Sequence, residues 1–191
     1  MKRLFIFSFA ALLLVACNKK DNSQNNTIDT AVEQEVPETV ENETEGPAEG
    51  REIGNKYIDI TLPGIQGNPV KLSDYVSKNR YTLVDFWASW CGPCRAEMHN
   101  VAQAYTEFHA KGLEIIGVSL DKDHDSWVEA ISQLEMPWPQ MSDLKGWECA
   151  GAETYNIRSI PANVLIDQQG IIVAKDLRGV GLLDKLSELM N

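Results

Sequence analysis

Two cysteines separated by two residues are the part of this chain best suited to chemistry. Cys91 and Cys94 enclose Gly92 and Pro93. Just before them, residues 81–86 form an apolar, β-branched run typical of a buried parallel strand. The pattern therefore predicts a C-x-x-C pair at the point where a strand ends.

A helix is predicted directly after the cysteines. Apolar residues recur there at helical spacing, and a glycine follows that can end the helix: Met98, Val101, Ala102, Tyr105, Phe108 and Gly112. Pro93 suits the first helical turn, where a missing N–H costs little. The free N–H groups and the positive end of the helix dipole would then face the Cys91 sulfur and favour its thiolate. Because the turn also brings Cys94 close to Cys91, the stretch predicts thiol–disulfide exchange.

Two other uses of a C-x-x-C pair deserve comparison. A tetrahedral zinc site needs two more ligands, and the chain offers no second paired motif but only Cys17, Cys149, His99, His109 and His124. A structural disulfide is the other alternative, although such bridges rarely lie at a strand-to-helix junction with Gly-Pro between the sulfurs. The context favours redox activity, with no metal and no cofactor.

The run from Val84 to Arg95, V-D-F-W-A-S-W-C-G-P-C-R, resembles the active-site segment of thioredoxin, and residues 155–161 resemble its second active-site segment. The resemblance covers most of residues 51–191. The leader and the longer middle section resemble the membrane-anchored TlpA/ResA-like branch, whose thioredoxin domains face the periplasm or the cell exterior. This implies an α/β thioredoxin fold, with a mixed central sheet flanked by helices, an N-terminal β-hairpin and a central insertion.

The resemblance assigns roles to three residues. Cys91, expected to be exposed, attacks the substrate disulfide, and the deeper Cys94 resolves the mixed disulfide. Asp85 lies where thioredoxin keeps a buried acid, so its pKa should be raised and it could accept the Cys94 proton. The alternative for Asp85 is a structural carboxylate at a strand end, but an acid within an apolar strand is costly.

Further residues should complete the site. Glu97 lies three residues after Cys94, on the same helix face, as in the ResA-like branch; an ordinary first-turn glutamate favoured by the helix dipole is an equal alternative. The bond between Ile160 and Pro161 should be cis and should offer a backbone edge to an extended substrate. The residues expected to bind substrate are Trp90, Gly92, Pro93, Ile160 and Pro161.

Three positions depart from thioredoxin or have no role in it. Where thioredoxin has a lysine near the buried acid, this chain has Gly117-Val118. His99 occupies the place of thioredoxin's helix-kinking proline. Cys149 is the odd thiol, and a small buried apolar residue is favoured for it over a third redox cysteine.

The first residues predict a lipoprotein leader over residues 1–17. A basic start is followed by a short apolar run over residues 4–16, too short for a membrane span. Leu14-Val15-Ala16-Cys17 resembles a bacterial lipobox, which makes Cys17 a lipid anchor. An ordinary secretory signal with a chance cysteine is the weaker alternative.

Residues 18–50 predict a disordered acidic tether between the leader and a thioredoxin-like domain at 51–191. The segment has nine acidic residues, two lysines and hardly any large apolar side chain. As a flexible coil it would reach roughly 30 Å. The predicted domain carries 13 basic and 19 acidic residues with no basic cluster, which argues against nucleic-acid binding.

The remaining elements are predicted from alternation, turn residues and caps. A strand at 56–62 and a return at 70–72 would form the hairpin, and Ser73 would begin a short helix. Ser126 could cap a helix reaching Leu134. The other expected elements are a strand at 113–120, a stiff loop with a short strand at 136–141, a helix ending at 151–155, a hairpin at 162–167 and 171–174, and a helix at 182–189.

These features predict an enzyme, an extracytoplasmic lipid-anchored thiol–disulfide oxidoreductase that reduces protein disulfides and receives electrons from a thiol protein. A disulfide-forming oxidant is the alternative. The reduction potential of the cysteine pair distinguishes the two: about −270 mV is typical of a thioredoxin-like reductant and about −120 mV of a strong oxidant. A peroxidase is a weaker alternative. A peroxiredoxin has Pro seven residues before its reactive cysteine and Thr or Ser three residues before it. Counted from Cys91 these positions are Val84 and Ala88, and counted from Cys94 they are Trp87 and Cys91, so neither cysteine fits. A peptide-binding module without catalysis would require a defective C-x-x-C pair.

Overall fold

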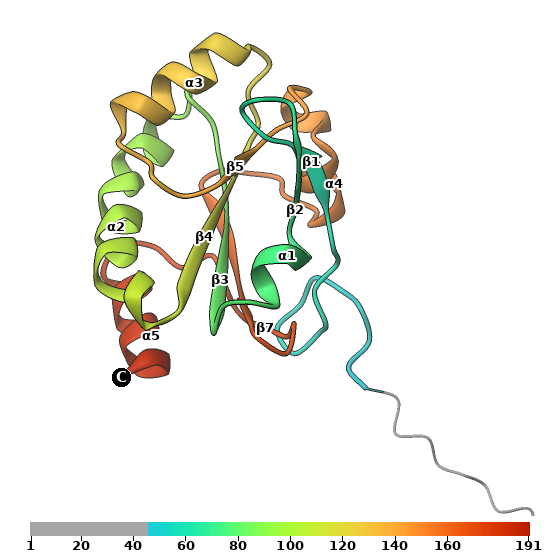
Figure 1. Ribbon diagram of the computed structural model, residues 1–191, viewed down its shortest axis with the longest axis vertical. Coiled ribbons are helices and arrows are strands. Elements are labelled where there is room, and N and C mark those ends of the chain that lie inside the picture. Colours follow the sequence, from blue (N-terminus) through green and yellow to red (C-terminus); the bar gives the residue numbers. More distant parts are fainter. Residues whose placement is uncertain (1–45) are drawn as a thin grey trace, which may run out of the picture. The chain divides into compact units, whose positions relative to one another are not determined.

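The computed structural model describes residues 46–191 (Figure 1). The predicted leader, Cys17 and most of the predicted tether lie outside the described residues. At the start of the described part, the N–H of Lys56 donates to the carbonyl of Ala48, and the N–H of Gly50 donates to the carbonyl of Lys56. Residues 48–50 therefore already bond to the folded unit that follows.

A five-stranded mixed sheet forms the centre of this unit, in the order β5-β4-β3-β6-β7. Its strands are β3 (Tyr81–Trp87), β4 (Leu113–Ser119), β5 (Gln140–Met141), β6 (Ala162–Asp167) and β7 (Ile172–Lys175). β4 runs parallel to β3 and β5 parallel to β4, whereas β6 and β7 are antiparallel to their neighbours. The predicted mixed sheet of a thioredoxin-like fold is confirmed.

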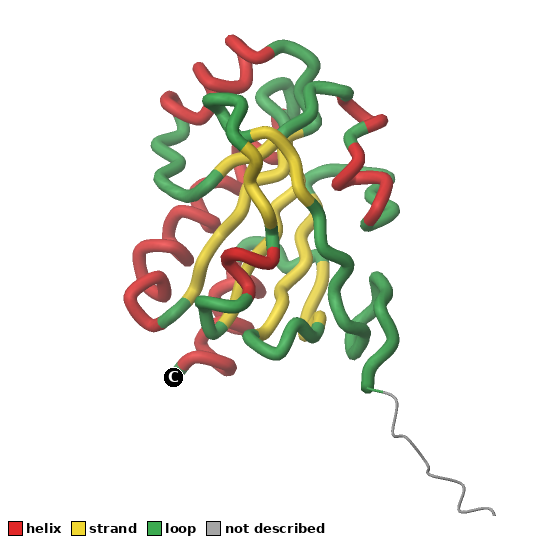
Figure 2. Tube along the Cα trace, turned by 45° about the vertical axis from the view of Figure 1, so that its right-hand side comes forward, coloured by secondary structure: helices red, strands yellow, loops and turns green. Residues whose placement is uncertain are grey.

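Helices cover both faces of the sheet, as Figures 1 and 2 show. On one side lie α2 (Gly92–Phe108) and α5 (Val180–Met190). On the other lie the short helices α1 (Ser73–Val76) and α4 (Ala150–Thr154). Since both faces are covered, every residue of β3 after Tyr81 is buried, which explains why this strand is an almost continuous apolar run.

The N-terminal hairpin is shorter than predicted. It consists of β1 (Thr61–Pro63) and β2 (Pro69–Lys71), whereas a strand was expected from residue 56 onwards. The earlier residues bond to other segments: the N–H of Tyr57 donates to the carbonyl of Gly170 at 2.8 Å. The alternating pattern therefore reflects a half-buried extended segment rather than a longer ladder.

Helix α3 (His124–Gln133) begins three residues earlier than a cap at Ser126 predicts, and Ser126 is not its cap. Asp123 caps the helix, because its Oδ1 accepts from the N–H of Ser126 at 2.8 Å and from the Ser126 hydroxyl at 2.6 Å. Aspartate is as good a cap as serine, so the local pattern allowed both. Two 3-10 turns, η1 (His109–Lys111) and η2 (Gly146–Glu148), complete the elements.

Gly117 makes room for a buried polar pair. A Cβ at this position would lie 2.1 Å from Oε1 of Gln140, which accepts a hydrogen bond from Nε1 of Trp87 at 3.1 Å. Gln140 is 3% exposed and Trp87 is fully buried. An added methyl group would therefore push the amide away from the indole N–H.

We predict that Gly117→Ala lowers the free energy of unfolding by about 1–3 kcal/mol, because the buried Trp87 N–H loses its acceptor. Urea unfolding followed by intrinsic fluorescence measures the change. Gly181→Ala is the matched control: a Cβ there meets open space in α5, and alanine favours helix over glycine by up to about 1 kcal/mol. Equal stability of Gly117→Ala and the wild type would contradict the packing argument.

Candidate active site

Cys91 and Cys94 form a disulfide at the start of α2. Cys91 is the N-cap of the helix, and the backbone N–H of Cys94 donates to its sulfur at 3.2 Å. Gly92 and Pro93 occupy the first two helical positions and are exposed. The predicted junction of strand, C-x-x-C pair and helix is confirmed, and the helix N-terminus is directed at the Cys91 sulfur.

The expectation that Cys91 is exposed is wrong for this oxidised form. Cys91 is 5% exposed and Cys94 is 1% exposed, so the difference between them is small, although Cys91 is the more accessible. The Cys91 sulfur lies 3.8 Å from the carbonyl oxygen of Ile160. The loop before β6 therefore covers much of the sulfur.

The peptide bond between Ile160 and Pro161 is cis, as predicted. Two side chains link Pro161 and Asn163, where this loop meets β6, to residues 177–178 just before α5. The guanidinium of Arg178 donates to the carbonyl of Pro161. Asn163 donates to the carbonyl of Leu177 at 2.7 Å and accepts from its N–H at 2.9 Å. Neither Arg178 nor Asn163 was predicted from the sequence.

Glu97 joins α2 to the same segment. Its Oε1 accepts a hydrogen bond from the backbone N–H of Gly179 at 2.7 Å. Gly179 has φ of +55° and precedes α5, so the carboxylate contacts the N-terminal end of a second helix. The alternative, a glutamate that only interacts with the dipole of its own helix, does not account for this bond to Gly179.

Asp85 is buried in the middle of β3, with 2% of its surface exposed. Its backbone neighbours in the sheet are Gly117 and Asn163. Burial raises the pKa of Asp85 from 3.8 to about 7, and the nearby charge of Glu97 acts in the same direction. At the position of the missing lysine, Gly117 leaves space that the Gln140 amide fills.

A polar cluster supports the residues before Cys91. The carboxylate of Asp121, which is 1% exposed, accepts from the hydroxyls of Ser89 and Ser119 at 2.6 and 2.7 Å and from the N–H of Ser89 at 3.1 Å. Sequence reasoning missed this cluster. Its signal was a pair of polar residues, Ser119 and Asp121, at the carboxyl end of a parallel strand, where functional residues of α/β sheets gather.

Other predictions for the site have mixed outcomes. Trp90, directly before Cys91, is 55% exposed. Cys149 is a free, fully buried thiol, and burial raises its pKa, in line with the favoured interpretation of an apolar residue.

Among residues 46–191 no group of three or more His, Cys, Asp and Glu side chains is placed to hold a metal ion. In the same range, no helix has the length and apolarity needed to cross a membrane.

Comparison with known proteins agrees with this geometry. A family model described as the AhpC/TSA family matches residues 53–175. The chain belongs to the AhpC/TSA family. Within this thioredoxin-superfamily group, the chain is 28% identical over 142 residues to the thiol-disulfide oxidoreductase ResA of Bacillus thuringiensis, covering 74% of this chain and 79% of that protein.

Solved structures give the same picture. The thioredoxin domain of a thiol-disulfide oxidoreductase from Bacteroides vulgatus has 36% identity and a TM-score of 0.67, covering 73% of this chain and 99% of that one. A thiol-disulfide oxidoreductase from Bacteroides fragilis has 33% identity and a TM-score of 0.66, covering 71% and 99%. This AhpC/TSA chain is thus a thiol–disulfide oxidoreductase with a thioredoxin-like fold.

We predict that Asp85→Asn stabilises the domain in a pH-dependent manner. Below pH 3.8 the carboxyl is protonated in both the folded and the unfolded chain, and the two states do not differ in bound protons. As pH rises from there to about 7, the folded chain holds a proton that the unfolded chain releases, so wild-type stability falls until ionisation in the folded state is complete.

The advantage of Asp85→Asn in free energy of unfolding should therefore grow by a few kcal/mol, roughly 1.4 kcal/mol for each pKa unit, between about pH 4 and pH 8. Chemical unfolding at a series of pH values measures it. Parallel stability profiles for the wild type and the variant would show that the carboxyl has an ordinary pKa.

Proposed function

We propose that this chain is an extracytoplasmic, lipid-anchored oxidoreductase that reduces disulfides in proteins. The observation that supports it most directly is the sulfur of Cys91 at the N-terminus of α2, accepting the N–H of Cys94 next to the loop of Pro161. The relatives named ResA are thiol-disulfide oxidoreductases. The Gly-Pro pair between the cysteines, as in thioredoxin, favours reduction over oxidation.

In the first step, the Cys91 thiolate attacks one sulfur of a client disulfide. A bond forms between Cys91 and that sulfur, the client disulfide breaks, and the second client sulfur leaves as a thiolate. The N–H of Cys94 and the helix dipole stabilise the attacking thiolate. Ile160 and Pro161, with Trp90, Gly92 and Pro93, are proposed to bind the extended client.

In the second step, Cys94 attacks the Cys91 sulfur of the mixed disulfide. The Cys91–Cys94 bond forms and the client leaves with both sulfurs reduced, so two electrons have passed from the protein to the client. The structure holds the oxidised product of this step. A partner dithiol protein then restores the cysteines, and no cofactor is needed.

Asp85 is proposed to accept the proton that Cys94 loses. A thiol enclosed in apolar surroundings ionises with difficulty, and a carboxyl with a pKa of about 7 can take up a proton near neutral pH. Glu97 is proposed to keep that pKa high through its charge and to hold the segment at Gly179 in place. Asp85 is thus proposed to act on the resolving cysteine, and Glu97 to act through Asp85.

The location follows from the first residues. Cys17 in the lipobox-like sequence is proposed to carry the lipid, and the acidic segment that follows is proposed to space the domain from the membrane surface. The clients are then proteins outside the cytoplasm, where disulfides persist. The reduction potential of the Cys91–Cys94 pair decides the direction of electron flow. A strongly oxidising value near −120 mV would identify the protein as an oxidant instead.

The two cysteines should respond differently to mutation. We predict that Cys91→Ser abolishes insulin-disulfide reduction, because the attacking thiolate is lost, and that Cys94→Ser accumulates mixed disulfides with clients, because nothing resolves them. Turbidity of reduced insulin and non-reducing electrophoresis measure the two effects. Cys149→Ser is the matched control, since that thiol is buried outside the pair. Normal turnover by Cys94→Ser would overturn the assignment of attacker and resolver.

Resolution should depend on Asp85. We predict that Asp85→Asn slows release of the client from the mixed disulfide by about 10–100-fold near neutral pH, because the amide cannot accept the Cys94 proton. The deficit should shrink as pH rises and hydroxide replaces the base. Stopped-flow fluorescence between about pH 5 and pH 9 measures it. Superimposable pH profiles would mean that Asp85 is structural.

A further inference from the structure

Two exposed tryptophans stand side by side next to the disulfide. Trp90 is 55% exposed and Trp147 is 46% exposed. Their ring centroids are 6.2 Å apart and the rings are tilted by 57°. In the described part of the chain only two other large apolar side chains, Ile53 and Val180, are this exposed. Indole surface left in water is a feature that calls for an explanation, because its burial would be favourable.

The two rings line a pocket of about 390 Å³. Its other walls include Leu120, Lys122, Gly146 and Ser89, the last directly before Trp90. This volume is at the lower end of the range for small-ligand sites and accommodates one large side chain. The pocket is thus continuous with the segment that presents Cys91.

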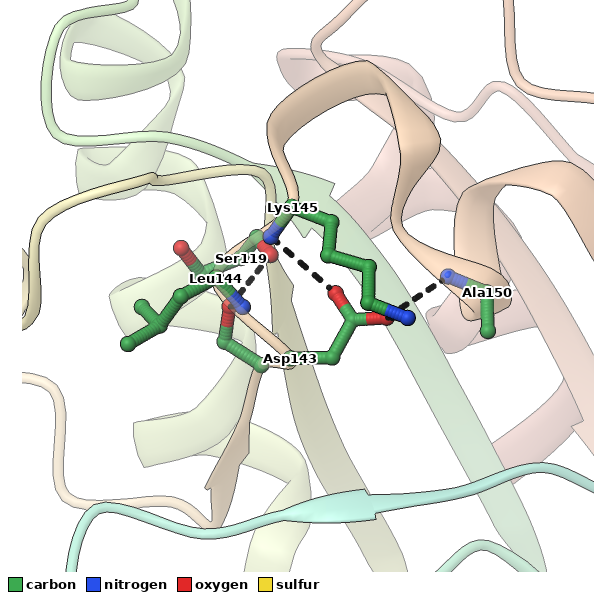
Figure 3. A network of polar contacts seen from close by, with 6 residues as sticks. Ser119, Asp143, Leu144, Lys145 and Ala150 are labelled. Carbon is green, nitrogen blue, oxygen red and sulfur yellow. Dashed lines mark hydrogen bonds and ion pairs between the residues drawn. The ribbon is translucent and has the colours of Figure 1, made fainter.

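The segment that carries Trp147 is held in place by a polar network (Figure 3). Asp143 accepts from the N–H of Lys145 at 3.3 Å and from the N–H of Ala150 at 3.1 Å. The hydroxyl of Ser142 donates to the carbonyl of Ser119 at 2.9 Å and accepts from the N–H of Leu144 at 3.1 Å. Residues 142–150 are therefore hydrogen-bonded to one another and to the end of β4.

Gly146 lets this segment pass close to the rest of the pocket. Its φ is +64°, and a Cβ there would lie 2.5 Å from Cε of Lys122. Its N–H donates to the carbonyl of Asp121 at 3.4 Å. The indole of Trp147 is consequently presented on a fixed backbone, which lowers the entropic cost of binding against it.

The acidic groups of the pocket already have partners. The Asp121 carboxylate accepts hydrogen bonds from the N–H and hydroxyl of Ser89 and from the hydroxyl of Ser119. Asp123 accepts two from Ser126 at the start of α3. Both oxygens of Asp121 and one oxygen of Asp123 are thus bonded within the protein, and the surface that the pocket offers to a ligand is mainly the apolar surface of Trp90, Trp147 and Leu120.

We propose that this pocket binds a bulky apolar side chain of the client polypeptide, aromatic or branched aliphatic, within three residues of the cysteine that Cys91 attacks. The inference rests on the proposed reduction of protein disulfides and names the class of client. Three residues of extended chain span up to about 10 Å, enough for a client joined to Cys91 to pass the neighbouring Ser89 and Trp90.

Peptide disulfides with one variable position test this inference. Each peptide carries one cysteine in a mixed disulfide with glutathione, and Phe, Leu, Gly, Lys or Glu is placed in turn at each of three positions on either side. The rate constant for attack by the reduced full chain is measured for the wild type, Trp147→Ala and Ile53→Ala. Ile53 is a matched control, because it is 63% exposed and does not line the pocket.

At one position we expect Phe or Leu to react about tenfold faster than Gly with the wild type and Ile53→Ala, and about twofold or less with Trp147→Ala. The same Phe-to-Gly ratio in Trp147→Ala and the wild type would overturn the inference, as would a preference for Lys or Glu over Phe. Comparing ratios within each variant separates recognition from any general change in reactivity.

Failure of the proposed function gives a different result. If the reduced wild type exchanged with none of the peptides, disulfide reduction itself would be wrong. Binding of a cysteine-free Phe peptide, followed through tryptophan fluorescence, then tests the pocket alone. Tighter binding to the wild type than to Trp147→Ala would support an apolar side-chain site, and equal binding would rule it out.

Discussion

The contact between the helix N-terminus and the Cys91 sulfur is the interaction on which the rest of the site depends. The N–H of Cys94 reaches that sulfur only because α2 starts directly behind the cysteine. The start of α2 is fixed in turn by β3, which is hydrogen-bonded to β4 and β6 on either side and covered by helices on both faces. A local hydrogen bond thus depends on the burial of the whole central sheet.

The same burial creates a conflict at Asp85. The Asp85 carboxylate is buried in the strand that fixes the active helix, and this burial raises its pKa to about 7. The charge of Glu97 adds to the effect instead of relieving it. Buried acids without a compensating cation lower stability, and such conflicts are expected where chemistry takes precedence over packing. Next to Asp85 in the sheet, Gly117 leaves room for the neutral amide of Gln140, which bonds to Trp87.

Local patterns were sufficient to predict the parts of the site that are close in sequence. The strand at 81–86, the cysteines and the helix after them are adjacent, and each has its own signal in apolar spacing or turn residues. The bonds of Arg178 to Pro161 and of Asn163 to Leu177 join segments many residues apart. Nothing in the spacing of single residues encodes them, since they depend on how β6 and β7 pair. The cap of α3 was misassigned for a simpler reason: Asp123 and Ser126 are equally good caps, and only the backbone geometry distinguishes them.

Three separate segments hold the site in place, and they contact different parts of it. Residues 160–163 and 176–179 bond to each other and to Glu97, so a change in either would alter the surroundings of the sulfurs. Residues 142–150 bond instead to the end of β4 and to Asp121, and they present Trp147 to the pocket beside Trp90. In the proposed function, redox chemistry and client choice thereby depend on largely different parts of the chain. If the segment carrying Trp147 selects the client as proposed, a change in that segment would alter the choice of client while leaving the geometry of α2 and its cysteines intact.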